Sequence, residues 1–266
     1  MEIKTFGKIT EIVNKNRDLC INKVEMDCDH ILSDKFPTDS YLSSYRSGFC
    51  QALIGPSNSG KTNWLVDMLL KGKKKGIQTG FRGIFNNVFV VSPSMGTIKS
   101  KKNPFLELPE EWIRNELSVD VLEEFKELCL EAKQDAEENN MEKPFNLLIL
   151  DDCASLLKDK YISPIFKILV ANRRHTYNCS IIFISQYTLD IPPSIRSNLT
   201  HCVIFYPKSL QEKEYIYMTW VGEEKKFMKP FYKSIFKIPH DYLLIDMTLQ
   251  TGVFRFYRQI NEILIG

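Results

Sequence analysis

Gly-Pro-Ser-Asn-Ser-Gly-Lys-Thr occupies residues 55–62 and matches every position of the phosphate-binding pattern Gly-x-x-x-x-Gly-Lys-[Ser/Thr]. An apolar run at 49–54 precedes the motif, and a helical pattern at 62–71 follows it. In this context backbone N–H groups and a helix N-terminus surround phosphates, the lysine neutralises their charge, and the hydroxyl reaches Mg²⁺. A surface loop with an ordinary lysine is the weaker alternative, because it would need no flanking strand and helix. The residues expected to bind nucleotide are Gly55, Pro56, Ser57, Asn58, Ser59, Gly60, Lys61 and Thr62.

The composition sets limits on the class of protein. A length of 266 residues suits one large α/β core with extensions, and a net charge of +2 does not by itself indicate a nucleic-acid binder. Seven scattered cysteines without a signal-peptide pattern favour reduced thiols. Cys20, Cys28 and His30 lack a Cys-x-x-Cys pair, so we expect no zinc site. No apolar run reaches the roughly 20 residues of a membrane-spanning helix.

Apolar runs and helical patterns alternate along the middle of the chain. The runs are continuous rather than alternating, as in strands buried on both faces of a parallel sheet. We expect strands at 49–54, 87–92, 146–151, 180–185 and 201–206, and helices at 62–71, 118–139 and 162–172. Strands that alternate with helices predict an α/β fold, a three-layer sandwich with a mostly parallel central sheet.

The segments outside this pattern are harder to interpret. The stretches 71–83 and 93–109 are predicted loops, the second with Lys99, Lys101 and Lys102, which are either solvated or contact a phosphate backbone. Helical patterns at 210–220 and 223–235 precede a predicted C-terminal β-hairpin of 242–246 and 253–257. The expected division is an N-terminal arm or accessory segment at 1–47, a P-loop ATPase core at 48–207, and C-terminal helices with the hairpin, packed on the core, at 208–266.

Two carboxylates follow the strand Leu-Leu-Ile-Leu at 147–150. The carboxyl end of such a strand opens onto the ligand crevice of an α/β sheet. Asp151 is therefore expected to orient Mg²⁺ or its water, and Asp152 to act as the general base on the attacking water. Two exposed acids that open a loop are the alternative, which the phosphate-binding motif about 90 residues upstream makes less favoured.

Two further observations concern the class of P-loop protein and the nucleotide that it binds. The strand at 87–92 is expected to fit between the phosphate-loop strand and the acidic strand, which indicates the additional-strand class of P-loop ATPases. No Asn-Lys-x-Asp motif for guanine is present, so ATP is the expected nucleotide. Gln186 ends the strand at 180–185, where its amide can bond both the γ-phosphate and the lytic water.

Two arginines are candidates for a residue that a neighbouring subunit supplies. Arg174 lies in Arg-Arg-His at 173–175, and Arg196 lies in Ile-Pro-Pro-Ser-Ile-Arg-Ser-Asn at 191–198. A guanidinium donated in trans would stabilise charge on the transferring phosphoryl group. A surface salt bridge or a contact to a DNA phosphate explains either arginine equally well.

Together these motifs resemble the poxvirus-type genome-packaging ATPases of large DNA viruses, a branch of the FtsK/HerA superfamily of DNA-pumping motors. The resemblance covers about residues 50–206. It rests on the phosphate loop, Leu-Leu-Ile-Leu-Asp-Asp, Arg-Arg-His with the Ser-Ile-Ile-Phe-Ile-Ser-Gln strand, and Pro-Pro-Ser-Ile-Arg-Ser-Asn-Leu-Thr-His.

The resemblance implies a homo-oligomeric ring that threads double-stranded DNA into a preformed viral capsid, with capsid or portal partners and ATP hydrolysed between subunits. It implies that Lys61 and Thr62 bind nucleotide and metal, that Asp151 supports Mg²⁺, and that Asp152, Gln186 and either Arg174 or Arg196 are catalytic. Many relatives carry Glu where this chain has Asp152. The implied location is the host-cell cytoplasm, in a viral factory, or the virion. Two alternatives stay open: a helicase or DNA-transfer ATPase of the same superfamily, and a nucleotide-gated assembly protein with little turnover.

Overall fold

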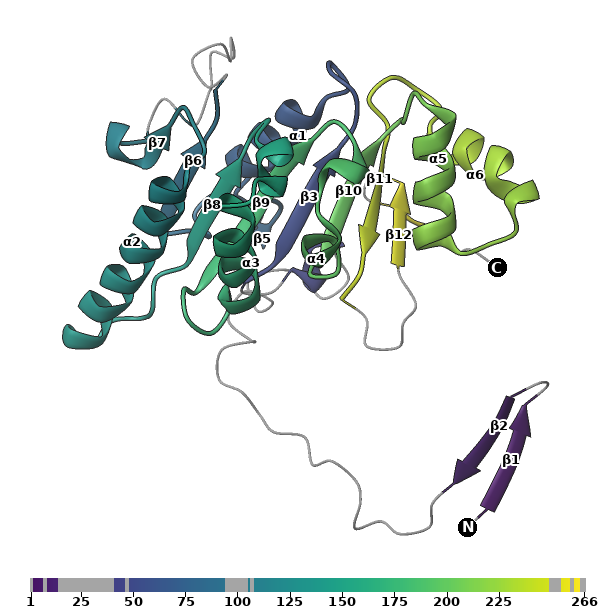
Figure 1. Ribbon diagram of the computed structural model, residues 1–266, viewed down its shortest axis with the longest axis horizontal. Helices are drawn as coiled ribbons and strands as arrows, with labels where there is room; N and C mark the ends of the chain where they lie inside the picture. Colours follow the sequence, from purple (N-terminus) through teal and green to yellow (C-terminus); the bar gives the residue numbers. More distant parts are fainter. Residues whose placement is uncertain are drawn as a thin grey trace.

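A nine-stranded sheet forms the centre of the part of the chain that the computed structural model describes, which is residues 2–6, 9–13, 41–45, 48–93, 105, 108–248, 255–258 and 261–263. Its strand order is β13-β12-β11-β10-β3-β9-β8-β6-β7, and Figure 1 labels the strands from β12 to β7. The strands are β3 (Cys50–Ile54), β6 (Asn87–Val91), β7 (Ile113–Arg114), β8 (Asn146–Leu150), β9 (Cys179–Ser185), β10 (His201–Phe205), β11 (Tyr242–Asp246), β12 (Arg255–Arg258) and β13 (Asn261–Ile263).

The six strands from β10 to β7 are parallel to one another, and β11, β12 and β13 continue the sheet antiparallel. Every residue of β3, β8, β9 and β10 is buried, as the continuous apolar runs predicted. The mostly parallel sheet and the C-terminal hairpin are therefore confirmed. The hairpin gains a third strand, β13, and the parallel part gains the two-residue edge strand β7, which is too short to leave a pattern in the sequence.

One expectation about strand order is wrong. The strand at 87–92, which is β6, does not lie between the phosphate-loop strand and the acidic strand; it pairs with the far side of β8. The strand between β3 and β8 is β9, which ends at Gln186. Burial gives the reason, because all seven residues of β9 are buried, as a central position requires, whereas β6 begins with two half-buried residues. An additional strand does lie between β3 and β8, but it is β9, which precedes Gln186, and not β6.

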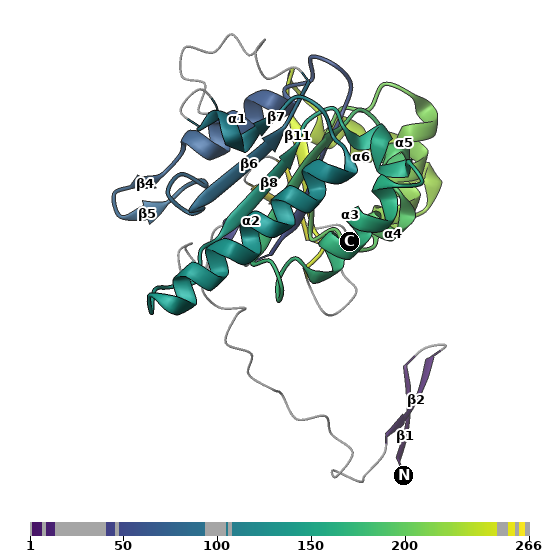
Figure 2. The same cartoon turned by 60° about the vertical axis from the view of Figure 1, so that its left-hand side comes forward.

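Helices cover both faces of the sheet, which confirms the three-layer sandwich. The helices α2 (Val119–Glu138) and α3 (Ile162–Asn172) pack on one face, where Phe125 and Phe166 join the core with Leu148. On the other face α1 (Lys61–Leu70) contributes Leu65 to the core around Leu147. Figure 2 shows α1 and α2 on opposite sides of the strands.

The C-terminal helices lie beyond the β10 side of the sheet (Figure 1). They are α5 (Leu210–Ile216), which runs into one π-helical turn (Tyr217–Val221), and α6 (Met228–Ile235), which follows a 3-10 turn (Lys225–Phe227). Both predicted helical segments are thus present, although the second begins later than predicted. The short helix α4 (Pro193–Arg196) lies on the connection from β9 to β10.

Short elements lie within the segments that were expected to be loops or the N-terminal arm or accessory segment. The stretch 71–83 holds a small hairpin of β4 (Lys73–Lys74) and β5 (Ile77–Gln78). The arm contains the hairpin of β1 (Glu2–Phe6) and β2 (Ile9–Val13) and a 3-10 turn at Tyr41–Ser44. Other 3-10 turns are Glu110–Trp112, Ala154–Lys158 and Thr188–Asp190. Cys20, Cys28, His30, Lys99, Lys101 and Lys102 lie outside the described residues. No helix in the described ranges is long and apolar enough to cross a membrane.

Candidate active site

The phosphate-binding motif forms the turn between β3 and α1. The Gly55 N–H donates to the Ser185 carbonyl of β9 at 3.1 Å, which joins the start of the turn to the neighbouring strand. A Cβ on Gly55 would come within 2.7 Å of Phe205 Cβ and 2.8 Å of Ser59 Oγ, so a side chain does not fit there. Gly60 has φ +110°, which L side chains rarely adopt, and it leads directly into α1. All eight residues expected to bind nucleotide lie in this turn or at the start of the helix.

Lys61 lies over the turn that precedes it. Its Nζ donates to the Gly55 carbonyl at 2.6 Å and to the Pro56 carbonyl at 3.0 Å. Burial lowers the pKa of the Lys61 amine, and the nearby charges of Asp152 and Asp151 raise it in part. The amine is therefore placed among the loop atoms, where a phosphate would find a positive charge and hydrogen-bond donors.

The acidic pair follows β8 and divides between two environments. Asp151 is buried, and its Oδ2 accepts a hydrogen bond from Ser92 Oγ at 2.9 Å. Asp152 is exposed and has φ +56°, a left-handed conformation that Asp adopts more readily than most side chains. The backbone therefore turns sharply after β8 and separates the two carboxylates. Ser92 is not among the predicted site residues, although, like Gln186, it is a polar residue at the end of a predicted strand.

Asp152 and Gln186 line one small cavity at the carboxyl edge of the sheet. The cavity has a volume of about 170 Å³ and lies between the ends of β8 and β9. Gln186 also lines a second space of about 80 Å³, together with Gly55, Pro56 and Lys208. The glutamine therefore lies between the phosphate-binding turn and the exposed carboxylate, as a residue that bonds both phosphate and water would need to.

Arg174 lies at the opposite edge of the sheet. It follows α3, and a Cβ on Gly48, just before β3 begins, would collide with the Arg174 side chain. Its neighbour Arg173 is buried and donates to the Gly48 carbonyl at 2.6 Å and the Val170 carbonyl at 2.5 Å. The Arg-Arg-His segment thus combines a structural arginine, Arg173, with an exposed one, Arg174.

Arg196 makes contacts within its own chain. Its Nη1 donates to the Ile191 carbonyl at 2.9 Å and the Thr188 carbonyl at 3.3 Å, and its guanidinium lies 5.3 Å from the centre of the Tyr215 ring. The side chain is half-buried. These contacts join α4 to the connection that follows Gln186 and to α5, so the structure brings neither arginine candidate together with Lys61.

Comparison with known proteins places the chain in a family. A family model described as Poxvirus A32 protein matches residues 34–238. The chain belongs to the poxvirus A32 family. Among curated proteins, "Uncharacterized protein 015R" of Frog virus 3 (isolate Goorha) is 25% identical over 204 residues, which cover 75% of this chain and 56% of that protein. "Uncharacterized protein 075L" of Invertebrate iridescent virus 6 is 29% identical over 205 residues, which cover 74% and 70%.

The match thus spans little more than half the length of the Frog virus 3 protein. Among solved structures, the genome packaging NTPase B204 from Sulfolobus turreted icosahedral virus 2 resembles this A32-family chain. Its complex with sulfate gives a TM-score of 0.52 at 12% identity over 84% of this chain and all of that one. Its complex with ATP-gammaS gives 0.51 at 11% identity over 79% and 96%. At this identity the likeness concerns the fold, and it confirms the expected P-loop architecture, while family membership confirms the resemblance drawn from the motifs.

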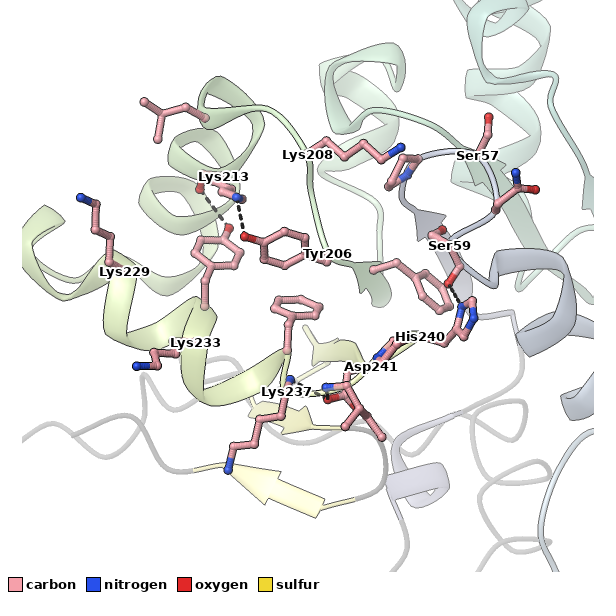
Figure 3. A pocket seen from close by; sticks show the side chains of 18 of the residues that line it. Ser57, Ser59, Tyr206, Lys208, Lys213, Lys229, Lys233, Lys237, His240 and Asp241 are labelled. Carbon is pink, nitrogen blue, oxygen red and sulfur yellow. Dashed lines mark hydrogen bonds between the residues drawn. The ribbon is translucent and has the colours of Figure 1, made fainter.

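One large feature of this A32-family chain escaped the sequence analysis. A cavity of about 910 Å³ lies between the phosphate-binding turn and the C-terminal helices (Figure 3). His240 lies at the boundary, where its Nδ1 is 2.9 Å from the Ser59 carbonyl. The next residue, Asp241, is buried and accepts hydrogen bonds from the backbone N–H groups of Lys237 and Ile238. The only signal in the sequence is the mixture of Lys, Tyr and Phe between 225 and 237.

Proposed function

We propose that this A32-family chain hydrolyses ATP to ADP and phosphate, and uses the reaction to move a double-stranded viral DNA genome into a preformed capsid. One observation supports hydrolysis most directly: Lys61, Asp151, Asp152 and Gln186, which come from three separate strand ends, lie together at the carboxyl edge of the sheet. The likeness to a protein described as a genome packaging NTPase, solved with ATP-gammaS, supports the choice of nucleotide and process.

Each residue has a role that its surroundings allow. The loop N–H groups and Lys61 hold the phosphates. Gln186 orients the attacking water, and the exposed Asp152 carboxylate accepts its proton. Because Asp151 keeps its carboxylate next to Ser92 while Asp152 faces a cavity, the two acids are suited to different tasks.

The residues also suit a magnesium ion. The hydroxyl of Thr62 and the carboxylate of Asp151 are hard oxygen donors, and Mg²⁺ is commonly bound by one or two such groups together with water and substrate phosphates. When bound, the ion would neutralise charge on the phosphates. The buried position of Asp151, with one oxygen already bonded to Ser92 Oγ, fits a residue that holds such a ligand in a fixed orientation.

The ring and its trans arginine belong to the same proposal. Arg174 lies at the edge of the sheet away from Lys61, so within one subunit it is distant from the phosphates. Arg196 would have to leave the Thr188 and Ile191 carbonyls to reach them. A neighbouring subunit that presents one of these guanidinium groups would complete the site and make hydrolysis depend on assembly.

Phosphate release measured with and without double-stranded DNA, alongside the oligomeric mass, tests this function. We expect an oligomer whose turnover rises when DNA is added, and no turnover from Lys61→Ala. A monomer whose turnover ignores DNA, also in the presence of capsid components, would contradict the motor. Turnover that survives Lys61→Ala would contradict the assigned ATPase site.

A further inference from the structure

The large cavity shares a wall with the phosphate-binding turn. Pro56, Ser57, Asn58 and Ser59 form one side of it, and the end of β10, α5, α6 and the segment before β11 form the others. The ribose and base of a nucleotide extend from the phosphates, so they must lie in a space next to this turn. The two small cavities near Gln186, of about 80 and 170 Å³, are below the 300–1,000 Å³ of typical ligand pockets, whereas the large one, at about 910 Å³, is within that range.

Aromatic rings line the interior of this cavity. The ring centres of Tyr206 and Phe236 are 5.3 Å apart in an edge-to-face pair, and Tyr232 stacks on Phe236 at 5.9 Å. Tyr206 is 47% exposed, and Lys213 Nζ lies 4.2 Å from the centre of its ring, so a base would meet the part of the ring that Lys213 and Phe236 leave open. Successive contacts hold these rings in place: Lys213 Nζ donates to Tyr206 Oη at 2.7 Å, and Tyr232 Oη donates to the Lys213 carbonyl at 3.0 Å.

The charged residues of the cavity stand mainly at its rim. Among the described residues, one carboxylate lines the cavity, that of Asp241, and it already accepts hydrogen bonds from two backbone N–H groups. The lysines of the described part that line it are Lys208, Lys213, Lys229, Lys233 and Lys237. In Figure 3 Lys208 extends toward the turn at Ser57, whereas Lys229 and Lys233 point away from the rings. Lys208 also lines the small space between Gly55 and Gln186. An aromatic interior with a basic edge at the phosphate side suits a nucleotide.

We propose that this cavity binds the nucleoside half of the nucleotide, with the base against the Tyr206–Phe236 pair and Lys208 beside the phosphate nearest the ribose. The inference rests on the proposed ATPase function and adds the part of the substrate that the phosphate-binding turn does not touch. Every base has a π face, so stacking on an aromatic ring does not require hydrogen bonds that read the base. This suits a pocket whose polar groups are mostly lysines.

Paired binding measurements on the full chain test the proposal, using ATP and inorganic tripolyphosphate, both with magnesium. Tripolyphosphate keeps the phosphates but lacks the nucleoside. We expect Tyr206→Ala and Phe236→Ala each to weaken ATP binding about ten-fold, the range for one lost base stack, and to leave tripolyphosphate binding unchanged. Tyr206→Phe keeps the ring and should restore ATP binding.

Phe227→Ala is the matched control, because Phe227 is a 50% exposed aromatic residue of the same C-terminal segment that does not line the cavity. It should change neither affinity. Lys61→Ala should weaken both ligands together. If Lys61→Ala acts on both while the Tyr206 and Phe236 variants leave the ratio of the two affinities unchanged, the nucleoside lies elsewhere and the inference fails. If Lys61→Ala changes neither affinity, the proposed nucleotide site itself fails.

Discussion

Lys61 is a charged side chain that folding has taken largely out of water and placed against two backbone carbonyls. Within the described residues no carboxylate forms an ion pair with this amine, and burial lowers its pKa, so holding the charge there costs free energy in the folded state. Such a cost is typical of a residue kept for binding rather than for stability. The loop around it requires glycine at two positions. A Cβ on Gly55 would collide with its neighbours, and Gly60 has a positive φ that other residues rarely adopt.

Removing the Lys61 amine should abolish most of the ATPase activity and leave the fold intact. We expect Lys61→Ala to lower kcat/KM by at least about 100-fold, the scale for losing one electrostatic contact to a transition state. The free energy of unfolding should change little, because the lost hydrogen bonds are offset by removal of a buried charge. Phosphate release and urea unfolding measure the two effects. Lys71→Ala, at an exposed lysine paired with Asp67, is the control and should change neither.

Asp152 should affect the chemical step rather than binding. Asn keeps the size and tolerates the positive φ of this position, so Asp152→Asn should fold and bind ATP normally. Its kcat should fall by about 10²–10⁴-fold, the contribution of a general base. Asp152→Glu should retain part of the activity, because a carboxylate is still present. Loss of ATP binding in Asp152→Asn would instead indicate a role in metal binding or in structure.

His240 should position the phosphate-binding turn. Its Nδ1 lies 2.9 Å from the Ser59 carbonyl, and its ring lies against Gly60. His240→Ala loses the hydrogen bond, so we expect KM for ATP to rise about five-fold, equivalent to about 1 kcal/mol, with a smaller change in kcat. His240→Asn can still donate to the carbonyl and tolerates the φ of +67° found here, so it should restore KM in part. An unchanged KM in His240→Ala would rule out this role.

The central strands could be predicted from the sequence because burial on both faces leaves continuous apolar runs, as in β3, β8 and β9. Their order could not be predicted, because strand pairing depends on contacts between residues far apart in the chain. The sequence alone does not show that β9, rather than the strand at 87–92, lies between β3 and β8. Short elements such as β7 have too few residues to show a period. The positions of Asp151, Asp152 and Gln186 at the carboxyl edge of the sheet could be predicted, because the first two follow the end of β8 and the third follows β9.

The cavity beside the turn could not be predicted, because it depends on how the C-terminal helices are attached. Glu212 of α5 is buried and accepts hydrogen bonds from the Thr188 backbone N–H at 2.7 Å and hydroxyl at 2.5 Å, two residues after Gln186. His240 makes the second attachment, at Ser59. Two polar contacts between residues distant in sequence thus hold α5 and α6 next to the candidate active site. Neither contact can be predicted from a local sequence pattern.

The pairing of β10 with β11 should make stability depend on pH. His201 on β10 is fully buried, stacks on Tyr45 with ring centres 3.7 Å apart, and has Nε2 3.9 Å from Asp246 Oδ1 on β11. Ser44 Oγ and Thr200 Oγ1 contact its two ring nitrogens at 3.0 and 2.9 Å. Burial lowers the pKa of His201 to about 4, and the charge of Asp246 offsets only part of this effect. The imidazole is therefore neutral in the folded protein at neutral pH.

The sign of the pH effect follows from that shift. Above the unfolded pKa of about 6.5 the histidine is neutral in both states; below it the unfolded chain takes up a proton first. The contribution of His201 to stability is therefore fully present above about pH 6.5 and is lost as the pH falls toward 4, by at most about 3 kcal/mol. Urea unfolding at pH 7 and pH 5 measures the loss. His201→Gln should remove this part of the pH dependence, and an unchanged slope in that variant would contradict the assignment.

In the proposed ring, a neighbouring subunit would complete the active site. Within one subunit Lys61 and the residues that follow β8 and β9 lie together, while the two arginine candidates do not join them. Both arginines could be named as candidates from the sequence. The sequence does not show which of them acts, because a contact with a second subunit leaves no pattern within one chain. Their positions do differ, since Arg196 is half-buried against the Thr188 and Ile191 carbonyls and Arg174 lies exposed at the opposite edge of the sheet.

Mixing two inactive variants tests which arginine acts in trans. A subunit with Lys61→Ala keeps both arginines, and a subunit with Arg174→Ala or Arg196→Ala keeps Lys61, so a mixed ring contains some sites with both groups intact. Random mixing in equal amounts gives an intact pair at about one quarter of the positions in a ring, because each site needs one particular neighbour. We expect phosphate release to reappear in the mixture for the arginine that acts across the interface.

Arg196→Ala also removes the contacts to the Thr188 and Ile191 carbonyls, so its unfolding free energy must be measured alongside activity. If Arg196→Ala is destabilised and does not complement while Arg174→Ala does, Arg196 holds the connection after Gln186 and Arg174 completes the neighbouring site. If instead Arg196→Ala complements and Arg174→Ala does not, Arg196 must leave the Thr188 and Ile191 carbonyls of its own subunit to contact the phosphate bound by its neighbour. ATP binding in one subunit would then change the contacts of the segment after Gln186 in the next. Complementation by neither arginine would exclude both as trans groups, and the site would then have to work with the charges of a single subunit.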